Sequence, residues 1–143
     1  MNSHRNIDVQ RRILDAVNTG KLEALRDLID GNVVDHDPAP GQGPGPLGFM
    51  ETFAELRAAF PNLHIEVKHT VADEHCVAIA YKLTGTHRGR FMDIAPTGHT
   101  IIVRGVQMAR FYGGHMVERW GALDELGILE QLGVAPGRNR MMA

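Results

Sequence analysis

The spacing of apolar residues changes from mainly helical to mainly strand-like near residue 63, and this change constrains the fold more than any other feature. Before it, apolar residues recur at helical spacing, and the clearest stripe is formed by Phe49, Met50, Phe53 and Leu56. After it, apolar and polar residues alternate, which is typical of strands that bury one face. The sequence therefore predicts helices first and a meander of strands afterwards.

Three helices are predicted in the first part of the chain, at about residues 6–18, 22–29 and 47–59, and a short closing helix at 125–132. A brief strand is predicted at 33–38, and longer strands follow at 63–71, 77–87, 100–111 and 116–123. This order indicates an α+β fold, a cone-shaped α+β barrel whose N-terminal helices pack on a curved, mainly antiparallel sheet. The interior of such a cone is a natural site for a small molecule.

A segment rich in proline and glycine separates the brief strand from the third helix. Residues 38–48 hold four prolines and four glycines, so no regular helix or strand is expected there. Two interpretations stay open for this segment: a flexible rim of the pocket, or a plain connection in solvent.

Composition and charge bound the class of protein. The 143 residues suffice for a single domain, with an ordered core expected over about residues 8–134 and a loose tail at 135–143. The formal net charge is 15 − 17 = −2, which gives no reason to expect a nucleic-acid partner. The N-terminal residues lack the apolar segment of a signal peptide, and no apolar run is long enough for a membrane span, so the expected location is cytoplasmic. Cys76 is the only cysteine, which excludes an intramolecular disulfide and fits a reducing compartment.

The last two long strands are predicted to form a hairpin around residues 113–114, because paired glycines tolerate the positive φ of tight turns. If Tyr112 lies opposite His115, regular pairing places Gln107 opposite Trp120. One face then carries an amide, an indole and a carboxylate among small residues: Gln107, Ala109, Trp120, Ala122 and Asp124. A slip of one residue would move the whole set to the other face.

Asp124 has two possible roles at the junction between the last strand and the closing helix. A carboxylate against an aromatic wall loses hydration and can exchange protons near neutral pH, so Asp124 beside Trp120 is a candidate catalytic acid/base. The amide of Gln107 and the indole N–H would hold a substrate oxygen as it gains charge. The alternative is that Asp124 only caps the helix that follows.

Two histidines are further candidates for the pocket. His36 ends the brief strand, where it could relay protons or hold a carbonyl; the alternative is a surface histidine between two solvated aspartates. His87 lies on the apolar face of its strand, which makes it a candidate pocket residue. The alternative is a structural histidine whose ring is hydrogen-bonded by backbone groups. Apolar walls or a lid are expected from Phe49, Phe53, Phe91, Met92 and Ile94.

Several other chemistries lack their motifs in this sequence. No His-x-His, His-Glu-x-x-His or cysteine cluster is present, so we expect no metal site. The only serine is Ser3, close to the N-terminus, which argues against a serine nucleophile. The glycines of residues 41–48 do not follow the dinucleotide-binding pattern. What remains is cofactor-free acid/base chemistry by aspartate and histidine.

Four segments together resemble the SnoaL-like polyketide cyclases of the larger NTF2-like fold: "VVDHDP", "RAAFPNLHIEV", "LTGTHRGRFMDIAPTGHTI" and "VERWGALDELGILEQLG". The similarity covers about residues 8–134. It implies a cone-shaped α+β barrel, a homo-oligomer and no cofactor. It also implies that Asp124 is the acid/base of an intramolecular aldol ring closure, and that His36 and His87 belong to the pocket. One departure is Arg119, which stands where the family often has a histidine before the tryptophan.

The leading hypothesis is therefore a cyclase-type enzyme that acts on an apolar, enolisable carbonyl compound, with Asp124 and His36 as catalytic residues and Gln107, Trp120 and His87 binding the substrate. The alternatives are a non-catalytic small-molecule-binding protein with the same pocket, or a related isomerase or epoxide hydrolase. Epoxide hydrolysis would need a second carboxylate and an arginine around a water. A strand face that carries Ile102, Val106 and Met108 favours a symmetric partner, hence a dimer or tetramer.

Overall fold

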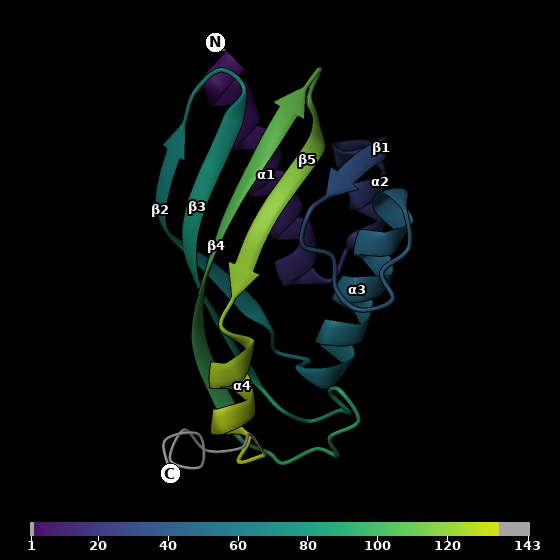
Figure 1. Ribbon diagram of the computed structural model, residues 1–143, viewed down its shortest axis with the longest axis vertical. Coiled ribbons are helices and arrows are strands. Elements are labelled where there is room, and N and C mark those ends of the chain that lie inside the picture. The colour runs from purple at the N-terminus through teal and green to yellow at the C-terminus, as the bar shows by residue number, and fades with distance from the viewer. Residues whose placement is uncertain (1, 135–143) are drawn as a thin grey trace.

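The structure is a computed structural model that describes residues 2–134 (Figure 1). In chain order its elements are α1 (Asn2–Thr19), the 3-10 helix η1 (Leu22–Ala24), α2 (Leu25–Leu28), β1 (Ile29–Asp35), α3 (Gly45–Ala59), β2 (His64–Ala72), β3 (Cys76–Thr86), β4 (Thr100–Tyr112), β5 (His115–Leu123) and α4 (Glu125–Gln131). The tail predicted at 135–143 lies outside the described residues.

The five strands form one sheet in the order β1-β5-β4-β3-β2. All neighbours are antiparallel except β1 and β5, which run parallel. Figure 1 shows α1 crossing behind the sheet, α3 beside β1, and α4 at the far end of β5. The predicted α+β architecture is confirmed: helices cover one face of a curved, mainly antiparallel sheet. No helix within residues 2–134 has the length and apolar character that a membrane span requires.

Alternation along β3 and β4 sends one set of side chains toward the helices. Val77, Ile79 and Leu83 are buried there, and Tyr81 packs among them as predicted. We call this side the helix-covered face, and the opposite side, which carries Val106 and Met108, the open face. The core therefore lies between the helix-covered face and α1, α3 and α4.

The second predicted helix is shorter than expected. Residues 22–28 form only η1 and α2, and Ile29 already has extended backbone angles (φ −118°, ψ 130°). Ile29 begins β1 because that segment pairs with β5, where Ile29 lies beside Met116. Pairing with a distant strand thus overrides a local helical pattern, as tertiary context often does.

A β-bulge in the last hairpin makes the predicted register wrong. Tyr112 pairs with His115 as expected, but the register shifts by one residue between Phe111 and Arg110. Gln107 consequently pairs with Gly121, whereas Trp120 pairs with Met108. Gln107 therefore belongs to the helix-covered face, and Trp120 and Ala122 belong to the open face.

A second bulge, between Val67 and His69, corrects the alternation predicted for β2. Val67 pairs with Tyr81, but His69 pairs with Ala80 and Val71 with Ala78. The extra residue turns the second half of β2 over, so His69 and Val71 project from the open face.

Asn18, at the end of α1, fastens that helix to β2. Its side-chain amide donates to the Ile65 carbonyl at 3.0 Å and accepts from the Ile65 N–H at 2.7 Å. We expect Asn18→Ala to lower the free energy of unfolding by about 1–3 kcal/mol, because both backbone groups lose their partner. Urea denaturation measures this loss. Asn32→Ala, at an exposed position of β1, is the control and should change stability by less than about 0.5 kcal/mol.

Candidate active site

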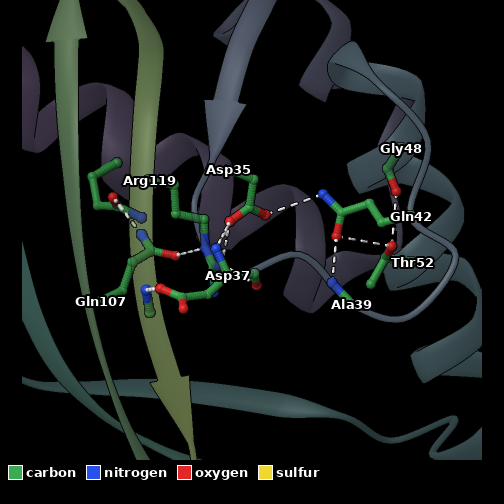
Figure 2. A network of polar contacts seen from close by, with 10 residues as sticks. Asp35, Asp37, Ala39, Gln42, Gly48, Thr52, Gln107 and Arg119 are labelled. Carbon is green, nitrogen blue, oxygen red and sulfur yellow. Dashed lines mark hydrogen bonds and ion pairs between the residues drawn. The ribbon is translucent and has the colours of Figure 1, made fainter.

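An ion pair between β1 and β5 organises the polar groups of the helix-covered face. Arg119 Nη1 lies 3.0 Å from Asp35 Oδ1, and the Asp35 side chain is only 7% exposed. The parallel register of the two strands places these residues side by side. Figure 2 shows Arg119 reaching across β5 toward Asp35, with Gln107 on its other side.

The ion pair continues into two side-chain amides. Arg119 Nε donates to Gln107 Oε1 at 2.9 Å, and Gln107 Nε2 donates to Gln10 Oε1 at 3.1 Å. A guanidinium can only donate, so the oxygen of Gln107 must face Arg119 and the oxygen of Gln10 must face Gln107. The polar chain Asp35–Arg119–Gln107–Gln10 therefore has a fixed direction. It ends at Gln10 Nε2, a buried donor without a partner among the described residues.

Two positions without a Cβ make room for the larger side chains of this site. The ring of Tyr81 occupies the space where a Cβ of Gly105 would lie. A Cβ on Gly121 would lie 2.5 Å from Arg119 Nη2. Because Gly105 and Gly121 sit on adjacent strands, the Tyr81 phenol and the Arg119 guanidinium share one region of the helix-covered face.

The Tyr81 phenol is held in its neutral form. Burial raises its pKa above the ordinary tyrosine value, and the nearby positive charge of Arg119 offsets only part of this rise. A neutral phenol is a hydrogen-bond donor, so Tyr81 and Arg119 together favour an oxygen that carries negative charge.

The loop after β1 is tied to the ion pair. Gln42 Nε2 donates to Asp35 Oδ2 at 3.1 Å, and Gln42 Oε1 accepts from the Ala39 N–H at 3.0 Å (Figure 2). The Thr52 hydroxyl of α3 donates to the Gly48 carbonyl of the same helix at 2.8 Å and lies 3.5 Å from Gln42 Oε1. The proline- and glycine-rich segment is thus anchored at the site by specific bonds.

Asp37 follows Asp35 at the end of β1 and reaches the same site. Its Oδ2 accepts from the Gly121 N–H at 2.9 Å, and its backbone carbonyl accepts from Arg119 Nη1 at 3.3 Å. Unlike Asp35, Asp37 is exposed. Arg119 therefore contacts the carboxylate of Asp35 and the backbone carbonyl of Asp37, while the Asp37 carboxylate faces Gly121.

Two depressions lie near these residues. One, of about 260 Å³, lies between α1 and strands β2 and β3, and Gln10 is part of its wall. The other, of about 570 Å³, is a shallow groove on the open face, lined by residues that include Val106, Met108 and Trp120, and by Asp37 at the edge of the sheet.

Asp124 lies away from the polar chain. It is the N-cap of α4: its Oδ1 accepts from the Gly127 N–H at 2.9 Å, and the residue is exposed. The capping role is confirmed. The expected shared face with Gln107 and Trp120 is wrong, because the bulge separates those two residues.

His36 also lies away from the polar chain. Its ring stacks on Trp120 with centroids 4.7 Å apart, and its Nε2 lies 2.6 Å from Glu118 Oε2. The pair belongs to the open face, because alternation along β5 sends Trp120 and Arg119 in opposite directions. The structure does not bring His36 or Trp120 together with Gln107.

His87 is a core residue with 0% exposure. Its Nδ1 accepts from the Thr97 N–H at 3.1 Å, so the proton of the neutral ring is on Nε2, and the ring packs against Phe60. Phe53 packs against both parts of the core, Phe91 and Ile94 pack at one end of it, and Met92 is 57% exposed. No contact between these residues and the polar chain is found among the described residues.

The sequence analysis missed Gln10, Asp35, Tyr81 and Arg119 as site residues. One signal was available: arginine at position 119 departs from the pattern of the resembled family. An arginine on a half-buried strand needs a carboxylate, and Asp35 of "VVDHDP" is one. Among the described residues, no group of three or more His, Cys, Asp or Glu side chains is arranged to hold a metal ion.

Comparison with known proteins places the chain in a family. The family model for SnoaL-like polyketide cyclases matches residues 7–132. The chain belongs to the SnoaL-like polyketide cyclase family.

Named relatives of this SnoaL-like chain include cyclases and a candidate hydroxylase. Aklanonic acid methyl ester cyclase DnrD of Streptomyces peucetius is 26% identical over 133 residues, which is 89% of this chain and 90% of that protein. The structure of IdmH, a candidate polyketide cyclase from Streptomyces antibioticus, is 32% identical with a TM-score of 0.78 and covers 90% of this chain and 99% of its own. AclR of Streptomyces galilaeus, a candidate hydroxylase, is 26% identical with a TM-score of 0.82, covering 94% and 85% of the two chains.

The raised pKa of Tyr81 has a measurable consequence. The chain has two tyrosines, Tyr81 and Tyr112. In an alkaline titration followed by ultraviolet absorbance, we expect one transition above the ordinary tyrosine range that Tyr81→Phe removes. The unfolded chain releases the Tyr81 proton at lower pH than the folded chain does. The stability that Tyr81 contributes therefore falls as pH rises from the pKa of the unfolded chain to the higher pKa of the folded chain. A Tyr81→Phe protein that keeps the late transition would contradict this description.

Proposed function

We propose that this SnoaL-like protein is a cofactor-independent cyclase that closes a ring in an apolar, enolisable carbonyl compound by intramolecular aldol addition. The single observation that carries the proposal is the directed polar chain from Asp35 through Arg119 and Gln107, which lies beside the neutral Tyr81 phenol. The DnrD and DauD relatives, whose names state the cyclisation of aklanonic acid methyl ester, support the same class of reaction.

The chemistry begins with removal of a proton from carbon next to a carbonyl. The electron pair moves to the carbonyl oxygen, and the enolate that forms is stabilised by the Tyr81 hydroxyl and the Arg119 guanidinium. The enolate carbon then attacks a second carbonyl of the same molecule, which closes the ring. The new alkoxide takes up a proton, so no cofactor enters the balance.

Asp37 is the acid/base in this proposal, in place of Asp124. Asp35 accepts bonds from Arg119, Gln42 and the Asp37 N–H, so its oxygens are already committed to donors. Asp37 accepts one bond through Oδ2, and no bond to its Oδ1 is found among the described residues. Asp37, whose backbone carbonyl accepts a bond from Arg119, is therefore the aspartate of this site that has a carboxylate oxygen left for a substrate proton.

Two aspartates in this chain allow a matched test. Asp37 and Asp124 are both exposed, and each accepts one bond of 2.9 Å from a glycine N–H. Asparagine keeps that bond at either position but cannot take up a proton. We expect Asp37→Asn to slow cyclisation of aklanonic acid methyl ester, and deuterium exchange of its acidic C–H, by at least about a hundredfold.

Asp124→Asn is the control and should keep the parent rate and stability, since asparagine is as good a helix cap as aspartate. The reverse result, a slow Asp124→Asn protein and an active Asp37→Asn protein, would return the role to Asp124. A parent protein that neither exchanges nor cyclises the substrate would leave the non-catalytic binding protein as the better description.

Epoxide hydrolysis is the second candidate, because two carboxylates, Asp35 and Asp37, and the guanidinium of Arg119 gather at the end of β1. Two carboxylates and an arginine are the groups that this reaction would need for an attacking water. The two reactions differ in product: incubation with an aryl epoxide in ¹⁸O-labelled water should give no labelled diol if the aldol proposal holds. A labelled diol whose formation Asp37→Asn abolishes would favour the hydrolase.

We also propose that the open face binds a second copy of this chain. It presents large apolar side chains that are more than half exposed, namely Val71, Ile102 and Val106. Those side chains are bordered by charges of both signs, such as Arg110 and Glu118, which pair at 3.4 Å. A symmetric pairing of two such faces would cover the apolar residues.

Val106→Lys should therefore turn a dimer or larger oligomer into monomers in light scattering at micromolar concentration. Leu126→Lys, at an exposed position of α4, is the matched control and should leave the oligomer intact. A parent protein that is strictly monomeric would contradict this arrangement.

A further inference from the structure

Gln10 ends the polar chain with an unsatisfied donor. The residue lies on α1 and is only 3% exposed. Its orientation follows from Arg119, because each amide in the chain must turn its oxygen toward the donor before it. If the Gln10 amide were flipped, its N–H₂ group would face the N–H₂ group of Gln107, and that hydrogen bond would be lost. A buried N–H₂ with no acceptor is uncommon in native proteins, which indicates that a hydrogen-bond acceptor for Gln10 is missing.

The depression of about 260 Å³ beside α1 includes Gln10 in its wall. Its other walls are mainly apolar, and they come from α1, β2 and β3: Ile7, Leu14, Ile65, Val67, Val77 and Ile79. Two charged residues of α1 also line it, but Arg11 and Asp15 neutralise each other at 3.1 Å. The pocket thus combines mainly apolar walls with a residue, Gln10, whose buried side-chain donor is unused.

We propose that this pocket binds an apolar carbonyl compound and that Gln10 Nε2 donates a hydrogen bond to its carbonyl oxygen. A neutral donor between apolar walls fits a ketone or ester oxygen better than a carboxylate or phosphate, because no unpaired positive charge faces the pocket. That the compound is the substrate rests on the proposed function. Gln10 is then a substrate-binding residue that the polar chain holds in one orientation.

The test compares two probes that differ only in the acceptor, acetylnaphthalene and ethylnaphthalene, bound to the full chain. One satisfied hydrogen bond is expected to give the ketone about a tenfold tighter Kd in calorimetric titration. Gln10→Leu should remove this preference and leave ethylnaphthalene binding unchanged. Because leucine leaves Gln107 Nε2 without an acceptor, a second variant is needed.

Gln10→Glu keeps an oxygen for Gln107 and replaces the free donor by an acceptor. At alkaline pH, where the glutamate is ionised, it should bind the hydrocarbon at least as well as the ketone. Thr70→Val is the matched control: this exposed residue lines the same pocket, and its loss should leave the ketone preference intact.

Three outcomes would overturn the inference. Equal binding of both probes to the parent protein would mean that an ordered water satisfies Gln10. A ketone preference that survives in both Gln10 variants would place the donor elsewhere, and binding of neither probe would exclude the pocket. None of these results touches the deuterium exchange that depends on Asp37, so the proposed function stands or falls separately.

Discussion

The arrangement of the helix-covered face depends on the ion pair between Arg119 and Asp35. A guanidinium among strand residues needs a carboxylate, and removing one partner of such a buried pair costs about 3–5 kcal/mol. Here the pair joins the edge strand β1 to β5 and anchors the loop after β1 through Gln42. It also orients Gln107 and Gln10, since a guanidinium can only donate. The Arg119 guanidinium thus determines which way the side-chain amides of Gln107 and Gln10 point.

The two faces of the sheet separate two kinds of surface. The helix-covered face carries the buried charge, the oriented amides and a neutral phenol over Gly105. The open face carries exposed apolar residues and the stacked pair of His36 and Trp120. Both faces derive from the same strands, because neighbouring side chains point in opposite directions. One sheet can therefore carry the proposed reactive groups on its helix-covered face and the proposed contact with a second copy of the chain on its open face.

Much of the fold could be predicted from periodicity alone, because long amphipathic strands and helices repeat their signal many times. The bulge between Arg110 and Phe111 could not be predicted in this way. One extra residue leaves the alternation intact on either side of it, but it puts Gln107 and Trp120 on opposite faces of the sheet. The unusual arginine at position 119 signalled the need for a carboxylate, but the sequence did not show that Arg119 and Asp35 form a pair. Its members are 84 positions apart and meet only because β1 lies parallel to β5. Asp124 illustrates the converse, since its capping role was visible locally.

The most direct test of the central claim, that the helix-covered face holds the reactive site, is a crystal structure of the chain with an enolisable diketone bound. The account predicts a ligand oxygen within hydrogen-bond distance of the Tyr81 hydroxyl or Arg119, with the acidic carbon facing Asp37. Asp37 also lines the groove of the open face, so the position of the oxygens decides: a diketone that lies in that groove against Trp120 and Val106, with no oxygen near Tyr81 or Arg119, would contradict it.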